Sequence, residues 1–129
     1  MAAIQHDRQT TEEWRSGVVT RMRVSALTGA TDLCIFEQWC APGTGAPPHR
    51  HPVEEVLTVL SGQMEVLLEG ERVNLCANES VLVPPEAVHS FTNTGENELH
   101  VLAVLASAFF EAVPVSTGVP VKRWLLPPG

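Results

Sequence analysis

The sequence predicts an all-β fold, either a sandwich or a barrel of short strands. Most of the chain consists of short runs in which apolar and polar residues alternate, the pattern of a half-buried strand. Glycine, asparagine and proline, the residues typical of turns, separate these runs at short intervals. The length of 129 residues suits a single domain built around one core.

The first alternating run covers residues 18–24 and places Arg21 and Arg23 on one side, where we expect solvated surface charges. Turn residues then delimit seven further predicted strands, at 33–41, 55–60, 64–68, 72–75, 80–83, 88–93 and 99–106. We take residues 17–107 as the core of a single domain that spans 1–129. Residues 1–16 form an N-terminal arm with a capped helical turn at 10–14, and residues 108–129 form a proline-rich C-terminal tail. We expect the tail to pack across a sheet edge or against a neighbouring subunit.

Two histidines and a glutamate stand at strand spacing between two glycines. His49, His51 and Glu55 are all odd-numbered, so they project to one side if the segment is extended throughout. Glu54 then points to the opposite side. Imidazole and carboxylate groups are common ligands of transition metals. The segment therefore predicts a metal site whose fourth ligand comes from elsewhere in the chain.

The expected fourth ligand is His89, which follows a turn marked by Pro84 and Pro85 and begins a short alternating run. A lone histidine in such a loop is more often a solvated turn residue. The joint pattern of two histidines, a glutamate and a second proline-marked histidine favours a metal site instead.

These two segments resemble the paired motifs of the cupin superfamily. The first motif matches at all of its defined positions, which are Gly43, His49, His51, Glu55 and Gly62. The second motif matches at Pro84, His89 and Asn93, but Asn78 and Glu86 stand where the family usually has glycine. The resemblance covers about residues 17–107 and identifies the chain as a small single-domain cupin.

The resemblance implies a double-stranded β-helix, also called a jelly-roll barrel, with a metal near its interior. His49, His51, Glu55 and His89 would hold a divalent transition metal ion and leave positions open for water, oxygen or substrate. Iron, manganese, nickel, copper and zinc all suit this ligand set. Calcium and magnesium do not, because both prefer shells made of oxygen atoms alone.

The expected substrate pocket is mainly apolar. Leu57, Val59 and Phe91 share the side of the ligands on their own strands, and Phe36 or Trp39 contributes from a neighbouring strand. No basic cluster stands near the ligands in the sequence, since Lys122 and Arg123 lie in the tail. We therefore expect a small, largely neutral organic substrate. His100 is expected at the surface.

The residues leave three functions open. The first is a dioxygenase-like, metal-dependent oxidoreductase in which Glu55 also acts as a base. The second is a small-molecule binding or sensor protein without catalysis. The third is a metal-dependent isomerase or cyclase. The absence of tyrosine argues against a sugar epimerase that uses a tyrosine acid.

The net charge of −7 argues against nucleic acid and anionic membranes as partners. The N-terminus lacks the apolar core of a secretory signal, and no apolar stretch is long enough to span a membrane. We expect a cytoplasmic protein. We also expect a homodimer, because small cupins commonly pair through terminal strands that cover open sheet edges.

Overall fold

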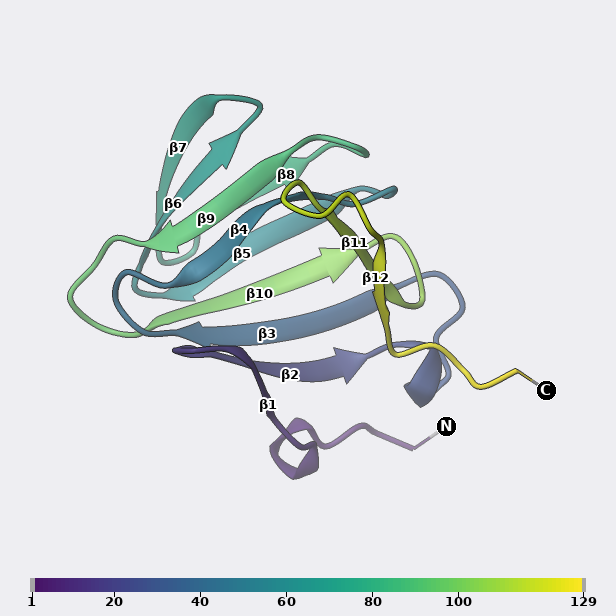
Figure 1. Ribbon diagram of the computed structural model, residues 1–129. Coiled ribbons are helices and arrows are strands. Elements are labelled where there is room, and N and C mark those ends of the chain that lie inside the picture. Colours follow the sequence, from purple (N-terminus) through teal and green to yellow (C-terminus); the bar gives the residue numbers. More distant parts are fainter. Residues whose placement is uncertain (1, 129) are drawn as a thin grey trace.

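Two antiparallel β-sheets of six strands each form the molecule, as a computed structural model that describes residues 2–128 shows (Figure 1). The first sheet has the order β1-β2-β3-β10-β5-β8 and the second the order β12-β11-β4-β9-β6-β7. The strands are β1 (Glu12–Arg15), β2 (Val18–Val24), β3 (Cys34–Cys40), β4 (Gly45–Arg50), β5 (Glu55–Ser61), β6 (Gln63–Leu68), β7 (Glu71–Cys76), β8 (Ser80–Val83), β9 (His89–Asn93), β10 (Leu99–Leu105), β11 (Phe110–Pro114) and β12 (Val121–Arg123). Two short 3-10 helices, η1 (His6–Arg8) and η2 (Ala26–Thr28), complete the fold. The all-β jelly-roll prediction is confirmed.

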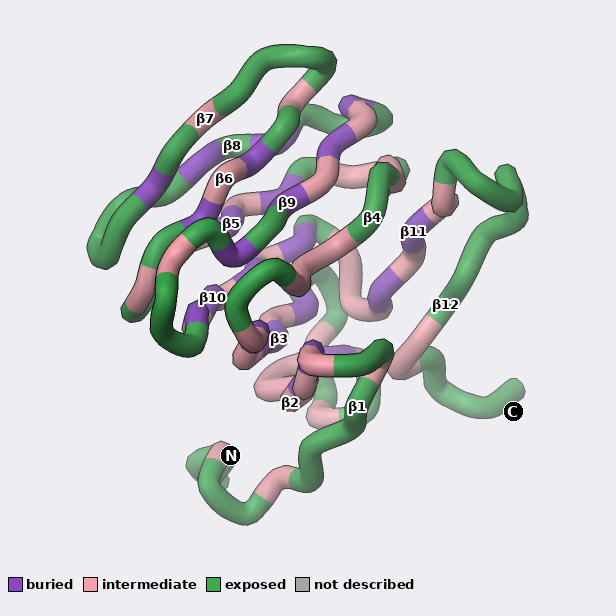
Figure 2. Tube along the Cα trace, turned by 60° about the vertical axis from the view of Figure 1, so that its left-hand side comes forward, coloured by how far each residue is buried: buried purple, intermediate pink, exposed green. Residues whose placement is uncertain are grey.

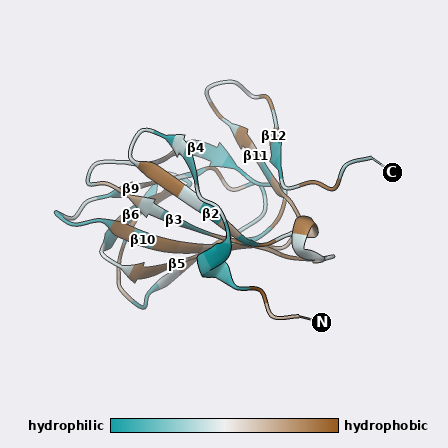
Figure 3. Cartoon of the chain, turned by 90° about the horizontal axis from the view of Figure 1, so that it is seen from below, coloured by the Kyte–Doolittle hydropathy of each residue, from teal (hydrophilic) through white to brown (hydrophobic). Residues whose placement is uncertain are grey.

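The core lies between the two sheets. Along β5, β6, β9 and β10 about every second residue is buried, as their alternating colours show (Figure 2). This period of two matches the alternation in the sequence, because successive side chains of a strand point to opposite faces of its sheet. Strand β10 is hydrophobic along nearly its whole length and occupies the middle of the first sheet (Figure 3).

The N-terminal segment differs most from the expectation. In place of a helical turn at residues 10–14, the chain forms strand β1, which pairs with β2 at the edge of the first sheet. The tail contributes β11 and β12, and β11 pairs with β4 in the second sheet. Both end segments therefore belong to the sheets, because their backbone groups find hydrogen-bond partners there.

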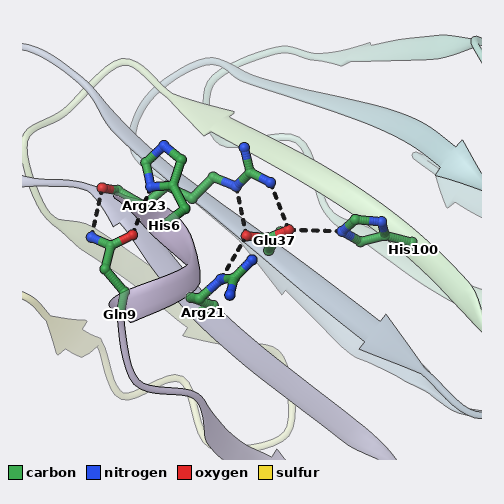
Figure 4. A network of polar contacts seen from close by, with 6 residues as sticks. All are labelled: His6, Gln9, Arg21, Arg23, Glu37 and His100. Atoms are coloured by element: carbon green, nitrogen blue, oxygen red, sulfur yellow. Dashed lines mark hydrogen bonds and ion pairs between the residues drawn. The ribbon is translucent and has the colours of Figure 1, made fainter. Parts of the chain in front are cut away.

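The outer face of the first sheet carries a buried carboxylate, Glu37, whose side chain is 0% exposed. Arg21, Arg23 and His100 surround it and donate hydrogen bonds of 2.6 to 2.9 Å to its two oxygens (Figure 4). The two arginines are thus paired on the side of β3 that faces away from the core. Gln9, which follows η1, donates a hydrogen bond to the Arg23 carbonyl oxygen and ties the N-terminal arm to this face.

Between residues 2 and 128, no helix has the length and apolar character needed to cross a membrane.

Candidate metal centre

Four side chains meet at one point between the sheets. His49 lies on β4, His51 follows that strand, Glu55 begins β5 and His89 begins β9. One possible ligand atom from each residue can be chosen so that all four lie within 4.8 Å of one another. His51, Glu55 and His89 are buried and His49 is half-buried. The four residues that the sequence singled out are therefore brought together in a cluster able to hold a metal ion.

The cluster forms because the chain changes sheets between His51 and Glu55. Strand β4 belongs to the second sheet, β5 belongs to the first, and residues 51–54 lie outside both strands. The idea of one continuous strand through residues 49–55 is wrong, since such a strand would separate the ends by about 20 Å. Glu54 is exposed, as expected. The reason is that it lies in this connection between the sheets, and strand alternation is not the cause.

Backbone carbonyl groups fix the orientation of all three imidazole rings. The Nδ1 atoms of His49, His51 and His89 lie 2.7, 2.8 and 2.9 Å from the carbonyl oxygens of Pro47, Glu111 and Ala87, respectively. A carbonyl oxygen only accepts hydrogen bonds, so each Nδ1 carries the proton and donates it. Each Nε2 therefore presents a lone pair in the neutral ring, which is the state that binds a metal.

The cluster has the donor set of a transition-metal site. His89 Nε2 lies 3.0 Å from one Glu55 oxygen, and His51 Nε2 lies 3.4 Å from the other. The buried His51 Nε2 has no hydrogen-bond partner. Lone pairs that face a carboxylate repel it unless a cation or a shared proton lies between them. Three imidazoles and one carboxylate suit a divalent transition metal ion, so the ligand atoms of this cluster fit such an ion.

The protonation states of His49 and Glu55 also favour metal binding near neutral pH. Burial and the neighbouring His89 and His51 lower the pKa of His49 to about 4, so this ring is neutral. Burial alone would raise the pKa of Glu55, but contacts with His51 and His89 in their protonated forms outweigh burial and lower the pKa to about 2. A neutral imidazole and an ionised carboxylate are the forms that ligate metals.

A cavity of about 150 Å³ opens beside the cluster. Its walls include three of the five predicted pocket residues, namely Phe36, Leu57 and Phe91. Val59 does not line the cavity, because it lies one step further along β5 and is fully buried in the core. Trp39 lies on the opposite face of β3 from Phe36 and stacks on His100 with ring centroids 4.8 Å apart. These two placements correct the expected pocket.

Residues from both ends of the chain complete the cavity. Trp14 and Arg15 come from β1, Phe110 begins β11 and Arg123 ends β12. The ring centroids of Trp14 and Phe110 are 5.0 Å apart, and those of Phe110 and His51 are 5.5 Å apart. The alternation at residues 110–114 was a local sign of a strand, but nothing in the sequence placed that strand beside β4. Although no basic cluster stands near the ligands in the sequence, two arginines, Arg15 and Arg123, line the same cavity.

The turn before His89 keeps the backbone conformation that glycine favours. Glu86 and Asn78, which replace the usual glycines, have φ angles of 67° and 69°. A left-handed conformation costs a residue with a side chain about 1–2 kcal/mol. The Glu86 N–H donates a 2.7 Å hydrogen bond to the His51 carbonyl oxygen, which joins this turn to the cluster.

Comparisons with known proteins agree with this geometry. The family described as "Cupin domain" matches residues 37–105. Auxin-binding protein 1 of Arabidopsis thaliana is 33% identical over 91 residues, which are 64% of this chain and 46% of that protein. The polyketide synthase CurC of Streptomyces cyaneus is 34% identical over 82 residues, covering 63% of this chain and 51% of CurC. This chain thus spans about half the length of such relatives.

Among solved structures, the polyketide cyclase RemF from Streptomyces resistomycificus superposes with a TM-score of 0.72. The match has 22% sequence identity and covers 81% of this chain and 78% of RemF. At this level of identity the likeness concerns the fold alone.

Proposed function

Because this chain belongs to the cupin family, we propose that it is a metal-dependent enzyme that acts on a small organic molecule. The observation that carries the proposal is the arrangement of His49, His51, Glu55 and His89 around one point at the wall of a cavity. A purely structural metal site is closed by protein ligands. Here the cluster borders a space of about 150 Å³, comparable to a cavity that binds benzene.

We assign the protein's own groups the following roles. The three histidines and Glu55 hold a divalent iron, manganese, nickel, copper or zinc ion, with backbone carbonyls keeping the rings in place. When bound, such an ion supplies Lewis acidity and, if it is redox-active, electron-transfer chemistry. Among the described residues lining the cavity, Glu55 is the only carboxylate. It is therefore the candidate base for removing a proton from a bound enol or phenol.

A dioxygenase-like oxidation is the first reaction we propose. The apolar walls formed by Phe36, Leu57, Phe91 and Phe110 exclude water and leave room for a single ring beside the ligands. These walls supported the expectation of a largely neutral substrate. Arg15 and Arg123, which line the same cavity, modify that part of the proposal because guanidinium groups attract anions.

Two other functions have a specific observation in their favour. Similarity to the polyketide synthase CurC favours an isomerase or cyclase, for which a bound metal would supply Lewis acidity and no oxygen would be consumed. Similarity to an auxin-binding protein favours a small-molecule binder or sensor that leaves its ligand unchanged. A cytoplasmic location and a homodimer, both expected from the sequence, remain part of this proposal.

One experiment separates these functions. The protein is purified without an affinity tag, its metal content is measured by elemental analysis, and it is reconstituted in turn with Fe²⁺, Mn²⁺ and Zn²⁺. Each form is incubated with a panel of single-ring enols, phenols and aryl acids, while oxygen uptake and product masses are recorded. His89→Ala serves as the metal-site control and Glu54→Gln as the matched surface control.

Oxygen uptake that depends on His89 supports the dioxygenase-like reaction. A product formed without oxygen uptake supports the isomerase or cyclase. Saturable binding without any product supports the binder. Failure of the reconstituted protein to hold any metal would refute the metal-dependent enzyme.

A further inference from the structure

All of the unpartnered buried polar side-chain atoms found among residues 2–128 belong to residues that line the cavity. These atoms are Trp14 Nε1, His51 Nε2 and Arg123 Nε. All three residues line the same cavity. Buried polar atoms in folded proteins nearly always have a partner, so each exception calls for an explanation. The metal site accounts for His51 Nε2, whereas the two N–H groups of Trp14 and Arg123 lie elsewhere on the wall.

The two N–H groups belong to the end of the cavity away from Pro114 and His49. On β11, Phe110 pairs with Arg123 of β12, and Pro114 at the other end of the strand pairs with His49 of β4. Four residues of extended strand separate these pairs by about 13 Å. Phe110 lies as a single ring between His51 and Trp14, at centroid distances of 5.5 and 5.0 Å. The Phe110 ring thus contacts both the Trp14 end of the cavity and His51 of the metal cluster.

This end of the cavity is positively charged. The Arg123 guanidinium carbon lies 4.2 Å from the centre of the Trp14 ring, which holds the group in place by a cation–π contact. Its nearest carboxylate, Glu12, is 3.9 Å away, at the outer limit of an ion pair. Arg15 also lines the cavity, and it donates a hydrogen bond of 2.8 Å to the Gly45 carbonyl oxygen. Although the protein has a net charge of −7, two arginines line this cavity, and Glu55 of the metal cluster is the only carboxylate among the lining residues between positions 2 and 128.

We propose that Arg123, with Arg15 and the Trp14 indole N–H, forms an anion subsite that binds the carboxylate of a single-ring organic acid. The ring of this acid lies along Phe110 and Phe36, and its other end faces His49, His51, Glu55 and His89. Guanidinium groups bind carboxylates through charge-assisted hydrogen bonds that neutral groups do not match. The inference rests on the proposed function, because the subsite and the metal cluster share one cavity. It replaces the largely neutral substrate with an aryl or cyclic acid.

The test measures the binding of benzoate and of its neutral analogue benzamide to the full-length chain by isothermal titration calorimetry. The chain is used both stripped of metal with a chelator and loaded with Zn²⁺. Two variants are compared with the wild type. Arg123→Gln removes the proposed anion-binding group. Lys122→Gln removes the same charge from the neighbouring position of β12, which is exposed and does not line the cavity. Thermal unfolding of each variant checks that the fold is retained.

The wild type should bind benzoate more tightly than benzamide even without metal. Arg123→Gln should weaken benzoate binding by about 10- to 100-fold, the effect of losing a charged hydrogen-bond donor. Lys122→Gln should keep the affinity for benzoate within about twofold of the wild-type value. The preference for benzoate over benzamide should disappear in Arg123→Gln.

Two results would overturn the anion subsite. One is equal benzoate binding by the two variants. The other is benzoate binding that requires Zn²⁺ and is lost in His89→Ala but retained in Arg123→Gln, since the carboxylate would then bind at the metal. A chain that binds benzoate through Arg123 but turns over no acid with any metal would instead count against the proposed enzyme. The two failures are therefore distinguishable.

Discussion

Replacing Glu37 with glutamine should destabilise the fold by an amount that depends on pH. Glu37 is fully buried on the outer face of the first sheet and accepts hydrogen bonds from Arg21, Arg23 and His100. Burial opposes its ionisation, but hydrogen bonds from Arg23, His100 and Arg21 outweigh burial and lower the pKa from 4.5 to about 2. Glutamine keeps the shape of the side chain but removes the charge that these donors share.

The size of the effect follows from the pKa. Each tenfold change in a protonation equilibrium is worth about 1.4 kcal/mol, so the ionised Glu37 contributes roughly 3 kcal/mol to the free energy of unfolding. A folded-state pKa below the unfolded value means that the contribution is complete above about pH 4.5, the ordinary pKa of a glutamate side chain. It is lost as the pH falls through the folded-state pKa of about 2. The variant should therefore be about 3 kcal/mol less stable than the wild type at pH 7, and the difference should shrink below pH 4.5.

Urea unfolding of the wild type and of Glu37→Gln at pH 7, 4.5 and 3.5 measures this difference. Glu86→Gln is the control, because Glu86 forms an ion pair of 3.1 Å with Arg50 in which both side chains are largely solvent-accessible. Such a surface pair should contribute less than about 1 kcal/mol. The reasoning fails if Glu37→Gln and Glu86→Gln lose the same stability at pH 7. It also fails if the loss in Glu37→Gln is as large at pH 3.5 as at pH 7.

Three further predictions concern the metal cluster, a glycine and the assembly. His89→Ala should reduce the metal content far below one ion per chain, while its circular dichroism spectrum stays that of the wild type. Glu54→Gln should keep the full metal content. Equal metal content in the two variants would contradict the metal cluster. Gly45→Ala should cost more than about 3 kcal/mol, because an added Cβ would overlap the backbone carbonyl group of Phe91. Gly95→Ala, where the nearest atoms are 3.5 Å away, should cost less than about 1 kcal/mol, and similar urea midpoints for the two variants would refute the close approach. Light scattering during gel filtration should give twice the chain mass of 14.0 kDa, and a single peak at 14.0 kDa would rule out the homodimer.

Local patterns in the sequence predicted most of the strands. The run at 18–24 became β2 with the same bounds, and the run at 80–83 became β8. Alternation predicts these strands because each of them buries one face, so apolar and polar residues alternate with a period of two. The prediction failed for the N-terminal arm, because Glu12–Arg15 is polar at three of four positions and shows no such period. Its strand exists because β2 offers it backbone partners.

The sequence by itself determined which four residues could ligate a metal, because imidazoles and carboxylates at motif spacing are a local property. Only the tertiary structure decided how they meet, through a chain that leaves the second sheet after His51 and enters the first at Glu55. It also decided the rest of the cavity, in which Trp14 and Arg123 touch although 109 positions separate their residue numbers. Such contacts depend on the order of strands in the two sheets. That order is fixed by packing and hydrogen bonding over the whole domain, and no single segment of sequence carries it.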